Sequence, residues 1–208
     1  HGVMLPYRFT SRESIEDAAA LAAALGIRLD TVPVASAVHG VEDALKEMFA
    51  GKPRDVTEEN IQARARGIIL MAISNKLGLM VVTTGNKSEM SVGYATLYGD
   101  MNGGFNPVKD LYKTEVFRLA RLRNVWKPSG ARGPGGRVIP ENIITRPPTA
   151  ELRENQLDQD SLPPYDVLDA ILERLVENEE PLAAIVASGH DRDTVVKVER
   201  LLHLAEYK

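Results

Sequence analysis

An almost uninterrupted apolar run at residues 79–84, LMVVTT, constrains the fold more than any other part of the sequence. It follows a long helical pattern that begins at Thr57, and it precedes a glycine-rich stretch that begins at Gly85. A short apolar run of this kind is typical of a parallel strand that is covered on both faces. Because such strands lie in the middle of α/β sheets, the run predicts that class of fold.

The segments around this run alternate between strand and helix patterns. The alternation predicts a Rossmann-like parallel sheet with flanking helices, whose ligands sit beyond the carboxyl ends of the strands. For the long helix we expect Thr57 as N-cap and an apolar stripe through Ile61, Ala65, Ile68 and Ala72. The elements are expected as strand 2–5, helix 14–25, strand 27–34, helix 37–49, helix 57–77, strand 79–84 and helix 111–123.

The C-terminal part of the chain has a different character. Residues 127–150 are rich in proline and glycine and predict a long loop. Residues 151–208 are acidic and predict a helical part, with helices at about 164–177, 181–188 and 192–207. We therefore expect one α/β domain over residues 1–208 that ends in helices.

Composition and charge exclude several classes of protein. The 208 residues include no cysteine, which excludes thiolate metal sites and cysteine nucleophiles in this segment. No apolar run approaches the ~18 residues of a membrane span. Residues 51–150 carry 15 Lys and Arg against 8 Asp and Glu, and both flanking parts are acidic. This pattern suits a small anionic ligand better than duplex nucleic acid, although a solvated surface with chance clustering would look the same.

Candidate functional residues gather where the 79–84 strand ends. The sequence Gly85-Asn86-Lys87-Ser88 is not a Walker phosphate loop, because Asn86 separates the glycine from the lysine. Thr84 offers a hydroxyl, and Glu89 offers a carboxylate that could hold Mg²⁺ against a polyphosphate. Asn60 and Arg64 lie one turn apart on the preceding helix. From spacing alone, a capping hydroxyl, a solvated glutamate and an exposed helix face are equally consistent with these residues.

Six stretches together resemble a known family. They are GVMLPYRFTS at 2–11, ENIQARARG at 59–67, VVTTGNKSE at 81–89, YGDMNGGFNPVKDLYKTEVFRLARLRN at 98–124, RPPTAEL at 146–152 and DSLPPYDVLDAIL at 160–172. This text resembles the synthetase domain of NAD⁺ synthetases, which belong to the N-type ATP pyrophosphatase superfamily of adenine nucleotide alpha-hydrolase folds. The resemblance covers nearly the entire chain.

The resemblance implies an ATP-dependent ligase of the cytoplasm. In this family the carboxylate of nicotinic acid adenine dinucleotide (deamido-NAD) attacks ATP, and ammonia then displaces AMP to give NAD⁺. The implied cofactors are ATP, as a substrate, and Mg²⁺; the implied assembly is a homodimer or a higher homo-oligomer. Two other functions stay open: a superfamily amidotransferase that acts on a different acid, and a noncatalytic nucleotide-binding module.

The resemblance also implies roles for individual residues. Glu89 and Lys113 are the expected catalytic residues, with Glu89 as the metal ligand; the dipole of the helix that Lys113 opens would favour anions. The expected ATP contacts are Thr84, Lys113 and Thr149. The expected deamido-NAD contacts are Asn60, Arg64, Glu89, Tyr94, Tyr98, Asp100, Tyr207 and Lys208.

Two departures from the family shape these expectations. The superfamily's Ser-Gly-Gly-x-Asp-Ser phosphate loop is absent, so we expect a piece of a longer protein that is inactive alone. Ammonia-using relatives carry lysine before the Tyr-Gly-Asp triplet, where this chain has Leu97. Together with Leu-Pro-Pro-Tyr at 162–165, this resembles the glutamine-dependent branch, whose nitrilase-like domain uses a cysteine. Such a domain is expected upstream, although the residues leave the nitrogen source open between glutamine and free ammonia.

Overall fold

A computed structural model describes all residues, 1–208, and divides them into two compact units. Unit 1 comprises His1–Leu79 and Leu119–Leu157, and unit 2 comprises Met80–Arg118 and Asp158–Lys208. Each unit has its own buried core and is described by itself. In neither unit is any helix both long enough and apolar enough to cross a membrane.

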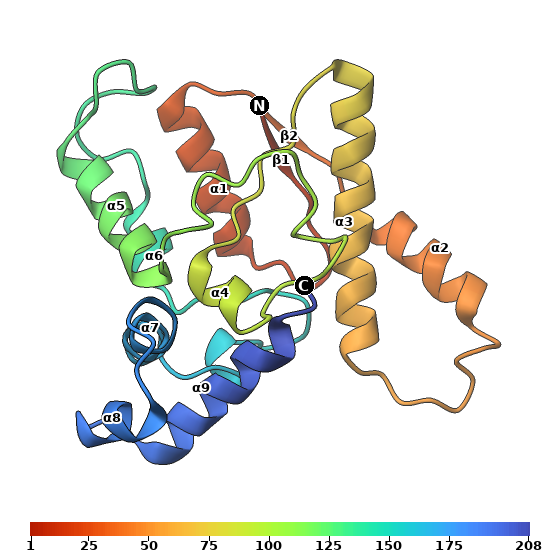
Figure 1. Cartoon of the computed structure of the whole chain (residues 1–208). Coiled ribbons are helices and arrows are strands. Elements are labelled where there is room, and N and C mark those ends of the chain that lie inside the picture. The colour runs from red at the N-terminus through yellow and green to blue at the C-terminus, as the bar shows by residue number, and fades with distance from the viewer. The chain divides into compact units, whose positions relative to one another are not determined.

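Unit 1 is built on a β-α-β unit (Figure 1). Strand β1 (Gly2–Met4) pairs in parallel with β2 (Leu29–Thr31), and Val3 lies opposite Asp30. Helix α1 (Arg12–Leu25) makes the connection that parallel strands require. Helix α1 starts two residues before the predicted Ser14, because the Ser11 side chain accepts from the Ser14 N–H and caps the helix there. It ends at Leu25 as predicted, and Gly26 follows in the left-handed conformation.

The core of unit 1 lies where α2 (Ala35–Leu45) packs on α3 (Val56–Leu77). Its buried residues are Tyr7, Val34, Val38, Ile61 and Ala65. The first half of the predicted stripe on α3 is therefore confirmed. The second half is wrong, since the Ile68 residue is 69% exposed and Ala72 is also at the surface.

The predicted N-cap of α3 is also wrong. Asp55, not Thr57, caps the helix, and its carboxylate accepts from the Thr57 N–H at 2.7 Å. The Glu58 side chain in turn accepts from the Asp55 N–H at 2.7 Å, which completes a capping box. An aspartate two residues upstream wins because it places a full charge at the positive end of the helix dipole.

The predicted loop at 127–150 is confirmed, except for the one short helix α6 (Glu141–Thr145). The loop is held by the last turn of α5 (Lys113–Val125). The Arg123 guanidinium donates to the carbonyls of Arg132 and Pro134, and the Asn124 side chain accepts from the N–H groups of Val138 and Ile139. These bonds replace the sheet or helix ladder that the loop lacks.

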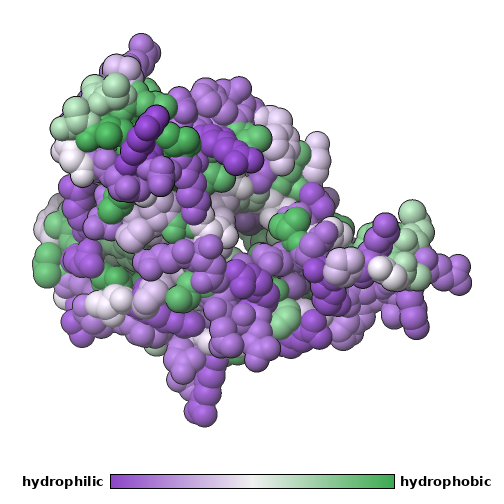
Figure 2. All heavy atoms as spheres, turned by 90° about the horizontal axis from the view of Figure 1, so that it is seen from below, coloured by the Kyte–Doolittle hydropathy of each residue, from purple (hydrophilic) through white to green (hydrophobic).

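The expected doubly covered strand at 79–84 is wrong. Within residues 80–84 only Val82 pairs with another segment, in an isolated parallel bridge to Phe105. The residues do not form an extended strand ladder. Met80 and Val82 are 64% and 53% exposed. An apolar run becomes a buried strand only when other layers cover both of its faces, and these residues have no such cover. Apolar groups reach the surface elsewhere too, as the green spheres among hydrophilic ones in Figure 2 show.

Unit 2 is helical, and its core lies among α7, α8 and α9. Its elements are α4 (Lys87–Ser91), the start of α5, the 3₁₀ turn η1 (Asp158–Asp160), α7 (Tyr165–Leu172), the π-helical turn η2 (Glu173–Glu177), α8 (Leu182–Ala187) and α9 (Arg192–Ala205). The three C-terminal helices are thus confirmed, whereas α4 falls inside the glycine-rich stretch after Gly85, for which no helix was predicted. Leu168, Ile171, Leu172, Ile185, Val195 and Val198 are fully buried between these helices.

Replacing one of these core side chains should destabilise the protein strongly. Leu168→Ala removes a side chain that has no exposed surface, and we expect a loss of about 2–5 kcal/mol in the free energy of unfolding. Denaturant unfolding of this variant beside a control variant checks this. Leu204→Ala on α9, where the leucine is 59% exposed, is the matched control; an equal loss in the two variants would contradict the proposed core.

Candidate functional site

The turn after residue 84 places Glu89 on a short, well-capped helix. The buried Asn86 side chain accepts from the Glu89 N–H at 3.0 Å and so caps α4. The Asn106 amide donates to the Gly85 carbonyl at 2.8 Å from the far end of the glycine-rich stretch. The turn is therefore fixed on both sides, and the Glu89 side chain starts from a defined position.

Glu89 and Lys113 form an ion pair, which brings the two expected catalytic residues together. The Lys113 Nζ atom lies 2.7 Å from Glu89 Oε1, and each side chain is only 19% exposed. The ammonium also faces two aromatic rings, with its nitrogen 5.3 Å from the Tyr165 centroid and 5.9 Å from that of Phe117. Partial burial and the ring faces strengthen this pair relative to one in open solvent.

A buried polar cluster holds the backbone where α5 begins. The Ser88 hydroxyl accepts from the Lys113 N–H at 2.8 Å and donates to Asp169 Oδ1 at 2.5 Å. Asp169 Oδ2 accepts from the Thr114 N–H at 2.9 Å. The positive end of the α5 dipole thus already faces the Asp169 carboxylate. At this end of the helix, the group available to an anionic ligand is the Lys113 ammonium.

Sequence analysis missed Ser88 and Asp169 as parts of the site. Ser88 stands inside the GNKSE motif, but a serine in a motif more often contacts solvent than a buried carboxylate. Asp169 lies four residues after Tyr165, so both project from one side of α7 toward Lys113. The four-residue spacing of Tyr165 and Asp169, next to the apolar face of α7, is the sequence feature that could have indicated Asp169.

The glycine-rich stretch runs against residues 81–83. The Thr83 N–H donates to the Phe105 carbonyl and the Gly104 N–H to the Val81 carbonyl, both at 2.9 Å. A Cβ on Gly103 would lie 2.5 Å from the Thr83 side chain and 3.1 Å from the Val81 carbonyl. Glycine is therefore required at position 103 for the glycine-rich stretch to approach residues 81–83 closely. Thr84, the residue after Thr83, is exposed.

Tyr94, Tyr98 and Asp100 lie on the segment after α4, in the same unit as Glu89. Asp100 Oδ1 accepts from the Thr96 N–H at 2.6 Å. Partial burial raises the pKa of Asp100, although the Thr96 hydrogen bond lowers it and the Glu89 charge adds to the rise. The Tyr98 ring is 73% exposed and its residue has a φ of 63°, whereas Tyr94 packs against the core.

The last residue of the chain ties this segment down. Lys208 Nζ donates to the carbonyls of Gly93 and Ala95, each at 2.5 Å. Burial lowers the pKa of Lys208, while the Asp100 charge raises it. Tyr207 is 74% exposed. Of the predicted C-terminal pair, Lys208 donates to main-chain carbonyls, and its ammonium nitrogen lies 5.9 Å from the centroid of the exposed Tyr207 ring.

The other expected contacts belong to unit 1. Asn60 and Arg64 lie one turn apart on α3, and Arg64 is exposed. The Thr149 hydroxyl accepts from the Glu151 N–H at 3.2 Å, and Glu151 pairs with Arg146 at 3.0 Å. The participation of Asn60, Arg64 and Thr149 in one site with Glu89 and Lys113 stays a prediction.

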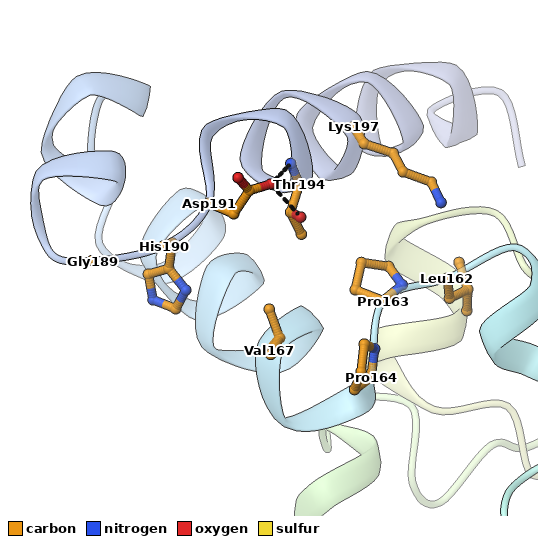
Figure 3. Close-up of a pocket in the computed structure, with 9 residues that line it drawn as sticks. All are labelled: Leu162, Pro163, Pro164, Val167, Gly189, His190, Asp191, Thr194 and Lys197. Atoms are coloured by element: carbon orange, nitrogen blue, oxygen red, sulfur yellow. Dashed lines mark hydrogen bonds between the residues drawn. The ribbon is translucent and has the colours of Figure 1, made fainter.

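A cavity of about 430 Å³ opens between the start of α7 and the start of α9 (Figure 3). Pro163, Pro164 and Val167 give it an apolar side, and Lys197 reaches toward it. The Asp191 carboxylate accepts from both the N–H and the hydroxyl of Thr194 and so caps α9. The Asp191 carboxylate therefore already occupies the positive end of the α9 dipole.

Comparisons with known proteins agree with the sequence resemblance. The family described as NAD synthase matches residues 1–208. A glutamine-dependent NAD(+) synthetase of Rhodobacter capsulatus is 60% identical over 208 residues, which are all of this chain and 38% of that protein. A solved structure of glutamine-dependent NAD+ synthetase from Acinetobacter baumannii in complex with adenosine diphosphate is 48% identical, with a TM-score of 0.64 over 96% of this chain and 34% of that one.

The chain belongs to the NAD synthase family. Its resemblance to the glutamine-dependent branch is confirmed, and it spans little more than a third of the length of these relatives. The structure of NMN synthetase from Francisella tularensis, at 21% identity, has a TM-score of 0.77 over 99% of this chain and 74% of that one. That likeness concerns the fold, and it confirms the predicted α/β class.

A methyl group at Gly103 should loosen the stretch that follows Tyr98. In Gly103→Ala the new Cβ would clash with the Thr83 side chain and the Val81 carbonyl and push residue 103 away from residues 81–83. The amides of Thr83 and Gly104 should therefore exchange hydrogen faster. Hydrogen exchange followed by NMR or mass spectrometry measures this. Gly135→Ala, where a Cβ meets nothing within 4 Å, should leave these amides unchanged; equal protection in both variants would contradict the close approach.

The stability of the protein should depend on pH through Glu151, which lies on the loop that carries Thr149. Burial alone would raise the pKa of Glu151, but hydrogen bonds from Ser11, Ser14 and Arg146 outweigh it and lower the pKa below its ordinary 4.5. A lowered pKa in the folded state gives stability that is present above pH 4.5 and is lost as pH falls through the folded value. The denaturation midpoint, measured from pH 5 to pH 3, should fall less in the Glu151→Gln variant than in the unsubstituted protein. An identical fall in both proteins would contradict this role.

Proposed function

We propose that this chain is the synthetase part of a glutamine-dependent NAD⁺ synthetase that amidates deamido-NAD at the expense of ATP. The substrate carboxylate attacks the α-phosphorus of ATP, the bond to the bridging oxygen breaks, and pyrophosphate leaves with the electron pair. Ammonia then attacks the acyl carbon, AMP leaves, and the nitrogen loses a proton. The partly buried Lys113–Glu89 pair, at a turn whose sequence matches the family, is the observation that carries the proposal.

Lys113 supplies the positive charge that the first step needs. Negative charge accumulates on the pyrophosphate as it leaves, and a fixed ammonium in a partly dry site stabilises that charge better than water does. Glu89 pairs with the ammonium in this structure. When a polyphosphate binds, the ammonium has a second anionic partner within reach. Thr84, on the segment before α4, and Thr149 are the further proposed contacts of the nucleotide.

Glu89 fits the expected Mg²⁺ only with help from the nucleotide. No group of three or more His, Asp or Glu side chains that could hold a metal occurs in the chain. Mg²⁺ is commonly bound through one or two carboxylates together with substrate phosphates and water, so a single glutamate is sufficient in that setting. A Mg²⁺ ion held there would neutralise phosphate charge, and the Glu89 carboxylate would bind the ion in place of Lys113.

The remaining contacts hold the dinucleotide and deliver nitrogen. Asn60, Arg64, Tyr94, Tyr98, Asp100 and Tyr207 bind deamido-NAD, and Lys208 supports them through the loop it anchors. Because relatives such as the Rhodobacter capsulatus protein are glutamine-dependent, we take the ammonia to come from glutamine, released by a nitrilase-like domain outside these residues, which contain no cysteine nucleophile. We place the reaction in the cytoplasm, and we propose a homodimer or a larger homo-oligomer as the working assembly.

Removing the ammonium should slow adenylation. In the full-length protein, Lys113→Ala should reduce kcat/KM for ATP by about 2–4 kcal/mol of transition-state stabilisation, the range for one electrostatic stabiliser. Pyrophosphate release with ATP, deamido-NAD and ammonia measures this. Lys109→Ala, an exposed lysine four residues earlier in the same unit, is the matched control and should keep full activity. Equal rates for the two variants would remove Lys113 from the reaction.

The identity of the acid is tested separately. Full-length protein is supplied with ATP and, in turn, deamido-NAD, its mononucleotide counterpart and other carboxylic acids. AMP formation that depends on deamido-NAD supports the proposal. AMP formation with a different acid alone assigns another amidotransferase, and ATP binding without AMP formation assigns a noncatalytic module.

A further inference from the structure

Three helices of unit 2 share one buried hydrogen-bonded cluster. A helix leaves its first N–H groups without partners inside the helix, and usually its own N-cap residue supplies one. Here the first two N–H groups of α5 are satisfied from elsewhere, by Ser88 on α4 and by Asp169 on α7. Ser88 is fully buried and Asp169 is 6% exposed. The Ser88 hydroxyl joins the two acceptors by donating to Asp169.

The placement of this cluster ties it to the ion pair. Ser88 immediately precedes Glu89 on α4, and Lys113 is the residue whose N–H the Ser88 hydroxyl accepts. The backbones are joined once more by the Lys87 N–H, which donates to the Leu111 carbonyl at 2.8 Å. Both members of the Glu89–Lys113 pair therefore start from backbone that the cluster fixes.

Helix α7 acts on Lys113 at both ends of the side chain. Asp169 fixes the turn from which the side chain leaves, and the Tyr165 ring lies 5.3 Å from the ammonium nitrogen. The Tyr165 hydroxyl donates to Asp158 Oδ2 at 2.8 Å, which holds the ring in place. A single helix thus sets both the origin of the side chain and the position of its charge.

We propose that Asp169, acting through Ser88, is a positioning residue for the Lys113–Glu89 pair. This inference rests on the proposed function, in which that pair meets the phosphates. A carboxylate that is more than nine-tenths buried is costly, and an apolar side chain of similar size would often serve stability equally well. What an apolar side chain cannot do is accept from the Thr114 N–H and the Ser88 hydroxyl at once. The cost of burial is offset by geometry that the reaction needs.

A double-mutant cycle in the full-length protein tests the proposal. Asp169→Asn keeps the size of the side chain but replaces one acceptor by a donor, and Ser88→Ala removes the link. Each should lower kcat/KM for ATP by at least about tenfold, because small misplacements of a catalytic group have effects of that order. In the Lys113→Ala background the same changes should lower kcat/KM by less than about twofold, since nothing is left to position. Asp166→Asn, exposed on the same helix, should leave activity unchanged.

Thermal unfolding of each variant separates positioning from a general loss of stability. A structural role lowers Tm equally with and without Lys113, so it predicts equal activity losses in both backgrounds. Losses of equal size in the two backgrounds, or full activity in both Asp169→Asn and Ser88→Ala, would overturn the positioning role and leave the proposed function intact. If Lys113→Ala itself has full activity, the proposed role of the pair fails as well. Should Asp169→Asn not fold, Ser88→Ala alone decides the question.

Discussion

A carboxylate that leaves water must find hydrogen-bond donors, and this requirement organises unit 2. Asp169 finds them in the Ser88 hydroxyl and the Thr114 N–H, and in doing so it fixes α4, α5 and α7 to one another. The apolar face of α7 supplies the burial through Leu168, Ile171 and Leu172. Apolar packing is not directional, whereas hydrogen bonds are, so the cluster adds a directional constraint on how these helices meet.

The same requirement explains where the candidate site lies. Glu89 follows Ser88 by one residue, and Lys113 carries the N–H that Ser88 accepts. Their ion pair is therefore a consequence of a polar cluster buried beneath it, and the pair itself is only partly covered. Charged groups that must exchange partners with a ligand need this combination of a fixed backbone and accessible side-chain ends.

Much of the fold was predictable from local signals. Helix α1 ends at Leu25 as expected, β1 and β2 lie within the predicted strands 2–5 and 27–34, and the three C-terminal helices were all expected. These predictions rest on capping and on hydrophobic periodicity, which act within a few residues. The prediction failed at 79–84, where a strand depends on cover from other layers, and at the N-cap of α3, where Asp55 competes better than Thr57.

The sequence by itself determined the family, the approximate places of most longer helices and the residue types of the candidate site, because motifs and hydrophobic periodicity are local. It named Glu89 and Lys113, but it could not place one 2.7 Å from the other. It also passed over Asp169, since an aspartate on an amphipathic helix is usually solvated. Only the tertiary structure decided that this carboxylate is buried, because burial depends on contacts between helices far apart in the chain. The same long-range contacts committed Lys208 to the carbonyls of Gly93 and Ala95.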